Sequence, residues 1–497
     1  MSERHDFVIA KASVGKFLLL QKEFLNVVPN TVESITNLIL EYNFWNDDSE
    51  NDEFIHLLMQ SIDRRPRNVK LYLQIVENII KIHPSILLLI KDNLLSTFER
   101  KTNRIYFIYL LVKNDLIKID DVILFIHQMF KDKAFKYMKL HRKYCLAMYC
   151  WFLPEMEKDN LNKFEEYKRL LEKSHESPYF KELGNLNIPF LKQYELLKNN
   201  DWYLFKKFRE GGINPNDVAN AIENDEIRDY GDINTVIEPS LFESCAFLNH
   251  YPTLIQYAAF FGSINAFNYL LRKGANTMLL DKKNRKLEDY AIAGGNDEII
   301  SIVFQNKSFD QTELPQNIPQ SSKSNIAKRR KIMDIGAERT FASCQNRVMK
   351  SGGRNNNKYL TQQTEYKPIE SKNVNNTNGY SNMMVVKFNR FGVIPANIDE
   401  KTFFKACKLN CLEFVIYAVE NGININCVDN YNNYPITYAA QYGNVDIVKF
   451  FSYLDGVDLS VIDSTIYFYF SVFIFLIWNS FSSCCMLRSF TCCKTFN

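Results

Sequence analysis

Residues 253–262 have the sequence TLIQYAAFFG, and this stretch carries the clearest structural signal in the chain. Two small residues, Ala258 and Ala259, lie inside an apolar run, and Gly262 ends it. Small side chains let two helices approach closely, and glycine readily adopts the left-handed conformation that ends many helices. The stretch therefore predicts a short helix that packs tightly against a neighbouring helix.

The same pattern returns after a fixed interval in two parts of the chain. The positions of Ala258 and Ala291 differ by 291 − 258 = 33, and those of Ala406 and Ala439 differ by the same amount, 439 − 406 = 33. A fixed period of this length indicates a helical hairpin whose copies stack on one another and share their buried faces. We therefore predict an all-α fold that contains an α-solenoid.

The period, the paired alanines and the sequence Gly274-Ala275-Asn276 after a leucine pair resemble the ankyrin repeat. The usual proline of that repeat is replaced by Leu254 in one copy and by Leu287 in another. Residues 238–296 also look like a domain of unknown function that precedes ankyrin arrays in large families from parasitic flagellate protists. Both resemblances imply a protein-binding module with no catalytic activity.

In ankyrin arrays, the finger loops and the outward positions of the first helices contact partners. The resemblance places a set of residues of this chain on that surface, and the aromatic ones among them suit binding because they bury much area at low entropic cost. The alternative for the two phenylalanines is packing against the neighbouring helical region. The candidate residues are Tyr257, Phe260, Phe261, Asn433, Tyr438, Gln441 and Tyr442.

The rest of the chain divides by composition. Apolar residues recur at helical spacing through residues 1–180, which predicts a helical N-terminal region. Residues 181–305 are expected to form the helical domain of unknown function with two ankyrin-like repeats, and residues 397–463 a second pair of repeats. Residues 306–396 are rich in Asn, Ser, Gln and Lys, which predicts a disordered linker. We expect the N-terminal helices to cap the first repeat pair and the second pair to dock on it.

The C-terminal tail, residues 464–497, is apolar and rich in cysteine. Its uncharged run is long enough to cross a bilayer as one helix, which would include Ile466, Phe470, Phe475 and Trp478. Two alternatives are a tail packed on the open end of the array and noncoding sequence read as protein. The alternative function is therefore an ankyrin adaptor tethered to a membrane.

A basic cluster, Lys328, Arg329, Arg330 and Lys331, lies in the predicted linker, where an import receptor could bind it. Short basic runs are also common in linkers that have no such role. The chain begins MSERHD, which is unlike a secretory signal. We expect a cytoplasmic protein, with the membrane and the nucleus as alternatives.

The composition argues against other classes of function. A formal charge of +3 over 497 residues gives no reason to expect a nucleic-acid partner. The sequence contains no phosphate-binding loop, no H-E-x-x-H and no G-x-S-x-G motif, and the adjacent cysteines near its C-terminus do not have zinc-ligand spacing. We therefore expect no catalytic residue, no metal site and no cofactor, and a protein partner whose identity the sequence leaves open.

Overall fold

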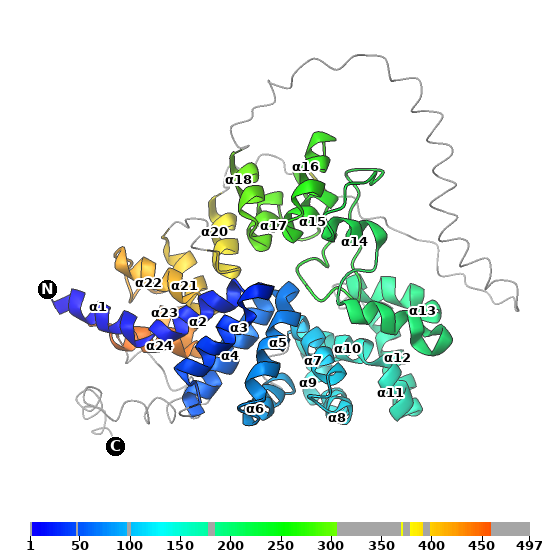
Figure 1. Ribbon diagram of the computed structural model, residues 1–497, viewed down its shortest axis with the longest axis horizontal. Coiled ribbons are helices and arrows are strands. Elements are labelled where there is room, and N and C mark those ends of the chain that lie inside the picture. The colour runs from blue at the N-terminus through cyan, green and yellow to red at the C-terminus, as the bar shows by residue number, and fades with distance from the viewer. Residues whose placement is uncertain are drawn as a thin grey trace, which may run out of the picture. The chain divides into compact units, whose positions relative to one another are not determined.

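The computed structural model describes residues 2–45, 48–96, 101–176, 184–305, 369–370, 378–390 and 398–458. The prediction of an all-α fold is confirmed, because the regular structure in these ranges is almost entirely helical (Figure 1). The described strands are two residues long: β1 (Leu279–Leu280) pairs antiparallel with β2 (Ile369–Glu370), and Leu279 lies opposite Glu370.

The N-terminal region is a succession of helices, most of which pack on neighbours one to three places along the chain. Its α-helices are α1 (Ser2–Ser13), α2 (Gly15–Leu25), α3 (Val32–Tyr42), α4 (Asp48–Arg64), α5 (Val69–Ile80), α6 (Ser85–Leu94), α7 (Ile105–Lys113), α8 (Ile119–Lys131), α9 (Lys133–Tyr137), α10 (Lys139–Trp151), α11 (Leu153–Asp159), α12 (Leu161–Glu176) and α13 (Gly184–Gly211). The 3₁₀ helices η1 (Pro29–Thr31), η2 (Pro66–Asn68) and η3 (Thr102–Arg104) connect some of them.

The core of this region follows from the helical spacing of its apolar residues. In α5, the buried side chains include Val69, Tyr72 and Val76, which recur at intervals of three and four residues. The Tyr72 ring packs edge-to-face with Phe24 of α2 at 6.0 Å between centroids, and its hydroxyl donates to the Phe24 carbonyl at 2.8 Å. Buried tyrosines need such a partner, because an unpaired hydroxyl in the core is costly.

The first repeat pair follows α14 (Asp217–Glu223). It comprises α15 (Leu254–Phe261), α16 (Ile264–Arg272), α17 (Leu287–Gly294) and α18 (Asp297–Gln305). The start of α15 is fixed by Thr253, whose side chain accepts from the Gln256 N–H while Gln256 binds back to the Thr253 N–H. Its end is fixed by Gly262, which has φ +70°. The starts of corresponding helices differ in position by 287 − 254 = 33 and by 297 − 264 = 33, as the sequence period requires.

The second repeat pair comprises α21 (Glu400–Leu409), α22 (Leu412–Glu420), α23 (Pro435–Gln441) and α24 (Val445–Ser452). The Asp399 side chain accepts from the Thr402 N–H and so caps the start of α21. Asn410 ends α21 with φ +55°, and asparagine tolerates this conformation better than most residues. The starts of the outer helices α22 and α24 differ in position by 445 − 412 = 33, the same period as in the first pair.

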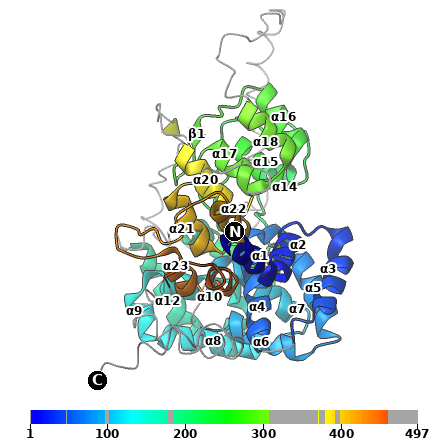
Figure 2. The same ribbon diagram turned by 90° about the vertical axis from the view of Figure 1, so that its left-hand side faces the viewer.

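One helix lies where the sequence predicts only a linker. Residues 378–387 form α20 (Asn378–Lys387), which packs on α17 on one side and on α21 on the other (Figure 2). The side chains of Val385, Val386 and Phe388 are buried there. The prediction of a linker over 306–396 therefore does not hold for 378–390. That prediction rests on the average composition, in which the polar residues on either side hide a short apolar run. Through α20, the inner helices of the two pairs form one stack.

One face of α4 contacts the second pair. His56 and Gln60 lie within 3.2 Å of the Asn444 side chain, in the loop between α23 and α24. One turn further on, Arg64 donates to the main-chain carbonyls of Leu409 and Asn410, at the end of α21. Because helix ends leave carbonyl groups unsatisfied, these contacts stabilise the junction between the N-terminal region and the array.

Several sequence predictions concern residues outside the described ranges. Among the described helices, none combines the length and the apolar sequence that a bilayer crossing requires. The proposed span and the basic cluster both lie outside these ranges; their residues are Ile466, Phe470, Phe475 and Trp478, and Lys328, Arg329, Arg330 and Lys331.

Candidate protein-binding surface

The turn between α22 and α23, which we call the second finger, is organised around one carboxylate. Asp429 accepts hydrogen bonds from the main-chain N–H groups of Tyr431 and Asn433 at 2.8 and 2.9 Å, and from the Tyr438 hydroxyl at 2.6 Å. Asn432 adopts φ +59° inside this turn. The carboxylate therefore holds the finger against the start of α23.

Hydrogen bonding also sets the charge of this turn. Partial desolvation opposes ionisation of Asp429, but the donors of Tyr438, Asn433 and Tyr431 outweigh it and lower the carboxyl pKa to about 2. Asp429 is therefore ionised at neutral pH. The same bond raises the pKa of Tyr438, whose hydroxyl stays protonated and keeps the ring in place as a donor.

Aromatic rings and lysines gather beside the finger on α21 and α23. Tyr431 is 83% exposed and Tyr442 is 41% exposed. The Lys408 ammonium lies 4.4 Å from the centre of the Tyr442 ring, a cation–π distance. The Phe404 and Tyr438 rings meet edge-to-face at 5.6 Å. We call this set the second-pair surface: Phe404, Lys405, Lys408, Tyr431, Asn433, Tyr438, Gln441 and Tyr442.

The residues predicted from sequence divide into two groups. Asn433, Tyr438, Gln441 and Tyr442 all retain exposed area and belong to the second-pair surface. The others, in the first repeat pair, are enclosed: Tyr257, Phe260 and Phe261 are between 1% and 6% exposed.

The enclosed rings pack against the protein itself. The Arg67 guanidinium lies 4.4 Å from the centre of the Phe261 ring and donates to the carbonyls of Phe260 and Phe261. Phe260 stacks on Phe247 at 5.7 Å. The two phenylalanines therefore pack on neighbouring segments of the chain, which is the alternative that the sequence left open. They are not accessible to a partner in this fold.

Sequence reasoning missed the most exposed ring of the surface, Tyr431, and its lysines, Lys405 and Lys408. Alignment of the two pairs would have indicated the lysines. Lys408 corresponds to Phe260, since both lie two positions after their paired small residue, at an offset of 408 − 260 = 148. A lysine where the first pair has a buried phenylalanine indicates that this face of α21 is not covered.

Comparison with known families agrees with this geometry. Residues 403–451 match the family model for ankyrin repeats (many copies). The protein contains ankyrin repeats. The match begins in α21 and ends in α24, so it covers both hairpins of the second pair and every residue of the second-pair surface. No curated protein matches the chain. The ankyrin finger and the inner helices are therefore the elements on which the candidate surface lies.

Within the part of the chain that the structure describes, no group of three or more His, Cys, Asp or Glu side chains is arranged to hold a metal ion. The described cysteines are buried; in α10, burial raises the pKa of Cys150 well above its ordinary value. A buried thiol of that kind is a poor nucleophile.

Proposed function

We propose that this protein binds a partner protein through the second-pair surface and acts as an interaction module. The observation that carries the proposal is the exposure of Tyr431 and Tyr442 beside two lysines on ankyrin inner helices. Tyrosine is enriched in binding hot spots because its ring is large, rigid and able to donate a hydrogen bond.

The charge of the surface indicates the kind of partner. Lys405 and Lys408 lie one helical turn apart on α21, and Lys401 is exposed on the same helix. Asp429 contributes one opposing charge, which these three lysines outnumber, and its oxygens already accept hydrogen bonds from within the turn. A segment with acidic side chains and an apolar anchor would complement this surface, and charge attraction would raise its association rate.

The resemblance of residues 181–305 to a domain that precedes ankyrin arrays in flagellate protists supports the same role. That family carries no established activity. In this chain, the corresponding residues pack against the N-terminal helices, so they support the array while the second pair supplies the contact surface.

The proposal is tested by photo-crosslinking in cells. A photoreactive amino acid replaces Tyr442, and crosslinked proteins are identified by mass spectrometry; a second position, the exposed Tyr203 of α13, serves as the control. We expect a partner that is crosslinked at position 442 and not at position 203.

The double variant Tyr431→Ala/Tyr442→Ala then measures the contribution of the rings. Recovery of that partner should fall about tenfold or more, which corresponds to a loss of about 1.4 kcal/mol or more of binding free energy. Tyr203→Ala should leave recovery unchanged. Equal recovery by the double variant and by Tyr203→Ala would remove the second-pair surface from consideration.

A further inference from the structure

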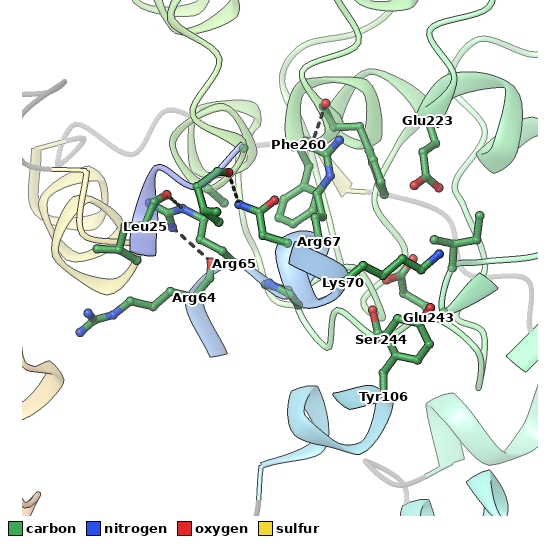
Figure 3. Close-up of a pocket in the computed structure, with 18 of the residues that line it drawn as sticks. Leu25, Arg64, Arg65, Arg67, Lys70, Tyr106, Glu223, Glu243, Ser244 and Phe260 are labelled. Carbon is green, nitrogen blue, oxygen red and sulfur yellow. Dashed lines mark hydrogen bonds between the residues drawn. The ribbon is translucent and has the colours of Figure 1, made fainter. Parts of the chain in front are cut away.

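A cavity of about 490 Å³ lies between the N-terminal helices and the first repeat pair (Figure 3). It is lined by the turn after α2, the segment that joins α4 to α5, the end of α14 and the ends of α15 and α17. Its volume is in the range of small-molecule sites, which is roughly 300 to 1,000 Å³.

The lining of the cavity carries an excess of positive charge. Five cationic side chains and two carboxylates, Glu223 and Glu243, line it, so the excess is at least 5 − 2 = 3 charges. Figure 3 shows Arg64 and Arg65 at one end of the cavity and the two carboxylates at the other, with Lys70 close to the carboxylates. The five cations are Arg64, Arg65, Arg67, Lys70 and Arg390.

The guanidinium groups at the basic end donate to main-chain carbonyl oxygens of the described residues. Arg65 donates to the carbonyls of Leu25 and Arg64 at 3.2 Å, and Arg390 donates to the Gly294 carbonyl at 2.9 Å. One nitrogen of each, Nη2 of Arg65 and Nε of Arg390, is buried and has no hydrogen-bond partner among the described residues. The Arg65 side chain is itself more than nine-tenths buried.

Two other buried arginines in this protein each form an ion pair with a carboxylate. Arg104 pairs with Asp63 at 2.8 Å, and Arg209 pairs with Glu155 at 2.7 Å. Within the described ranges, neither Arg65 nor Arg390 forms such an ion pair; for the partly buried Arg390, burial lowers the pKa to about 10 and the nearby Asp297 carboxylate offsets only part of this effect. A buried cation without an anion is costly, since it loses its hydration without a compensating charge. Burial, followed by repulsion from Arg390, accordingly lowers the pKa of Arg65.

We propose that the cavity binds a small phosphate-bearing molecule, with its phosphate between Arg65 and Arg390. Guanidinium groups match phosphate oxygens in paired hydrogen bonds, and both arginines line the cavity and have a nitrogen without a hydrogen-bond partner among the described residues. Inorganic phosphate alone would leave most of the volume unfilled.

The other end of the cavity indicates what the phosphate is attached to. Glu223 has a buried carboxylate oxygen without a partner among the described residues. A carboxylate accepts hydrogen bonds from hydroxyl or amino groups, so the ligand should carry such donors several bonds from its phosphate. A sugar phosphate fits this chemistry. This ligand site is separate from the second-pair surface and does not depend on the proposed function.

The test is titration calorimetry on the full chain with ribose 5-phosphate, at fixed ionic strength. We expect binding with a dissociation constant below about 1 mM, a rise in the thermal unfolding midpoint with ligand concentration, and at least tenfold weaker binding by Arg65→Gln and Arg390→Gln. Arg272→Gln, which changes an arginine of α16 outside the cavity, is the control and should bind as the wild type does.

Ribose and inorganic phosphate separate the two ends of the site. Glu223→Gln should weaken binding of ribose 5-phosphate while leaving that of inorganic phosphate unchanged, and ribose alone should not bind measurably. Without ligand, Arg65→Gln should unfold at a temperature no lower than the wild type, because it removes an unpaired buried cation; if this variant fails to fold, Arg390→Gln decides. Absence of heat and of any midpoint shift in the wild type, or equal binding by the arginine variants, would overturn the proposal.

Discussion

Residues 281–290 of the first repeat pair and residues 429–438 of the second occupy equivalent places, at an offset of 429 − 281 = 148 in the sequence. Each segment contains a turn and the start of the inner helix that follows it. Both turns begin with an aspartate that accepts a hydrogen bond at 2.6 Å from a tyrosine nine residues later. The local structure is therefore shared, although the aspartate of the first turn is buried and that of the second is partly exposed.

Two side chains account for much of the difference. In the first pair, Arg285 donates to Asp281 at 2.5 Å, and its guanidinium lies 3.8 Å from the centre of the Phe247 ring. The carboxylate is therefore covered, although the tip of the turn, residues 282–284, is exposed. In the second pair, the equivalent residue is Asn433, since 433 − 285 = 148, and its shorter side chain donates to Asp429 within the same turn. The comparison teaches that one repeat plan gives a covered pair or an open pair according to which side chains lie over the carboxylate of its turn.

The largest expected effect concerns the equivalent residues Phe260 and Lys408. Phe260→Ala should lower the free energy of unfolding by about 3 to 5 kcal/mol, because it leaves a cavity against Phe247. Lys408→Ala should change it by about 0.5 kcal/mol or less. Urea unfolding followed by circular dichroism measures both, and similar losses for the two variants would contradict the distinction between a covered pair and an open pair.

The next largest effect is the expected difference in stability loss between substitutions of the two equivalent aspartates, Asp281 and Asp429. Asp281→Asn leaves the buried Arg285 guanidinium without its anion, which should cost about 3 kcal/mol of stability. Asp429→Asn removes only a partly exposed set of hydrogen bonds, so we expect about 1 kcal/mol or less. The same urea titration compares them; a greater loss for Asp429→Asn would mean that the second finger, rather than the first, depends on its carboxylate.

The pH dependence of stability tests how the first pair is covered. Burial raises the pKa of Glu243, next to Tyr257, to about 8, with a smaller contribution from Glu223. The folded state therefore holds this proton more tightly than the unfolded state, so the stabilising contribution is complete below the ordinary pKa of 4.5 and is lost as pH rises to about 8.

Glu243→Gln should remove this dependence. Relative to the wild type, its stability should improve by on the order of 2 kcal/mol between pH 5 and pH 8. Thermal unfolding at several pH values measures the difference, with Glu238→Gln, an exposed position, as the control. Parallel curves for the wild type and Glu243→Gln would show that this carboxyl is not the titrating group.

The smallest expected effect is in the second finger. Tyr438→Phe removes the 2.6 Å hydrogen bond to Asp429 and should raise the pKa of that carboxyl above its value of about 2. A depressed carboxyl pKa stabilises the fold above the ordinary pKa and loses this contribution as pH falls towards 2, so the variant should lose about 0.5 to 1 kcal/mol at neutral pH. NMR titration of the Asp429 carboxyl measures the shift, and an unchanged pKa would refute the assigned bond.

Local features of the chain were predictable from sequence. The repeat interval can be recognised because positions between two inner helices, such as Ala258 and Ala291, require small residues. The helix ends follow from residues such as Gly262. The all-α fold was predicted for these reasons. The same reasoning placed Tyr438 and Tyr442 on a surface that is accessible in the second pair.

Long-range packing was not predictable in the same way. Helical spacing gives the apolar face of α15, but which segment covers Phe260 depends on Phe247 and on the N-terminal helices. Arg67 contacts Phe261 across 194 residues, and no local pattern signals such a contact. α20 escaped prediction because its short apolar run lies in polar sequence, so its helical structure depends on its neighbours α17 and α21.

The position of α20 has a consequence for how the gene for this protein can be rearranged. Because α17, α20 and α21 are joined by side-chain packing, covalent continuity between Gln305 and Asn378 is not what aligns the two repeat pairs. The cost of closing a connection grows only slowly with its length, by about 0.6 kcal/mol for each doubling. The alignment of the two repeat pairs should therefore survive a change in the length of the chain that joins them, such as an inserted domain or a moved splice junction.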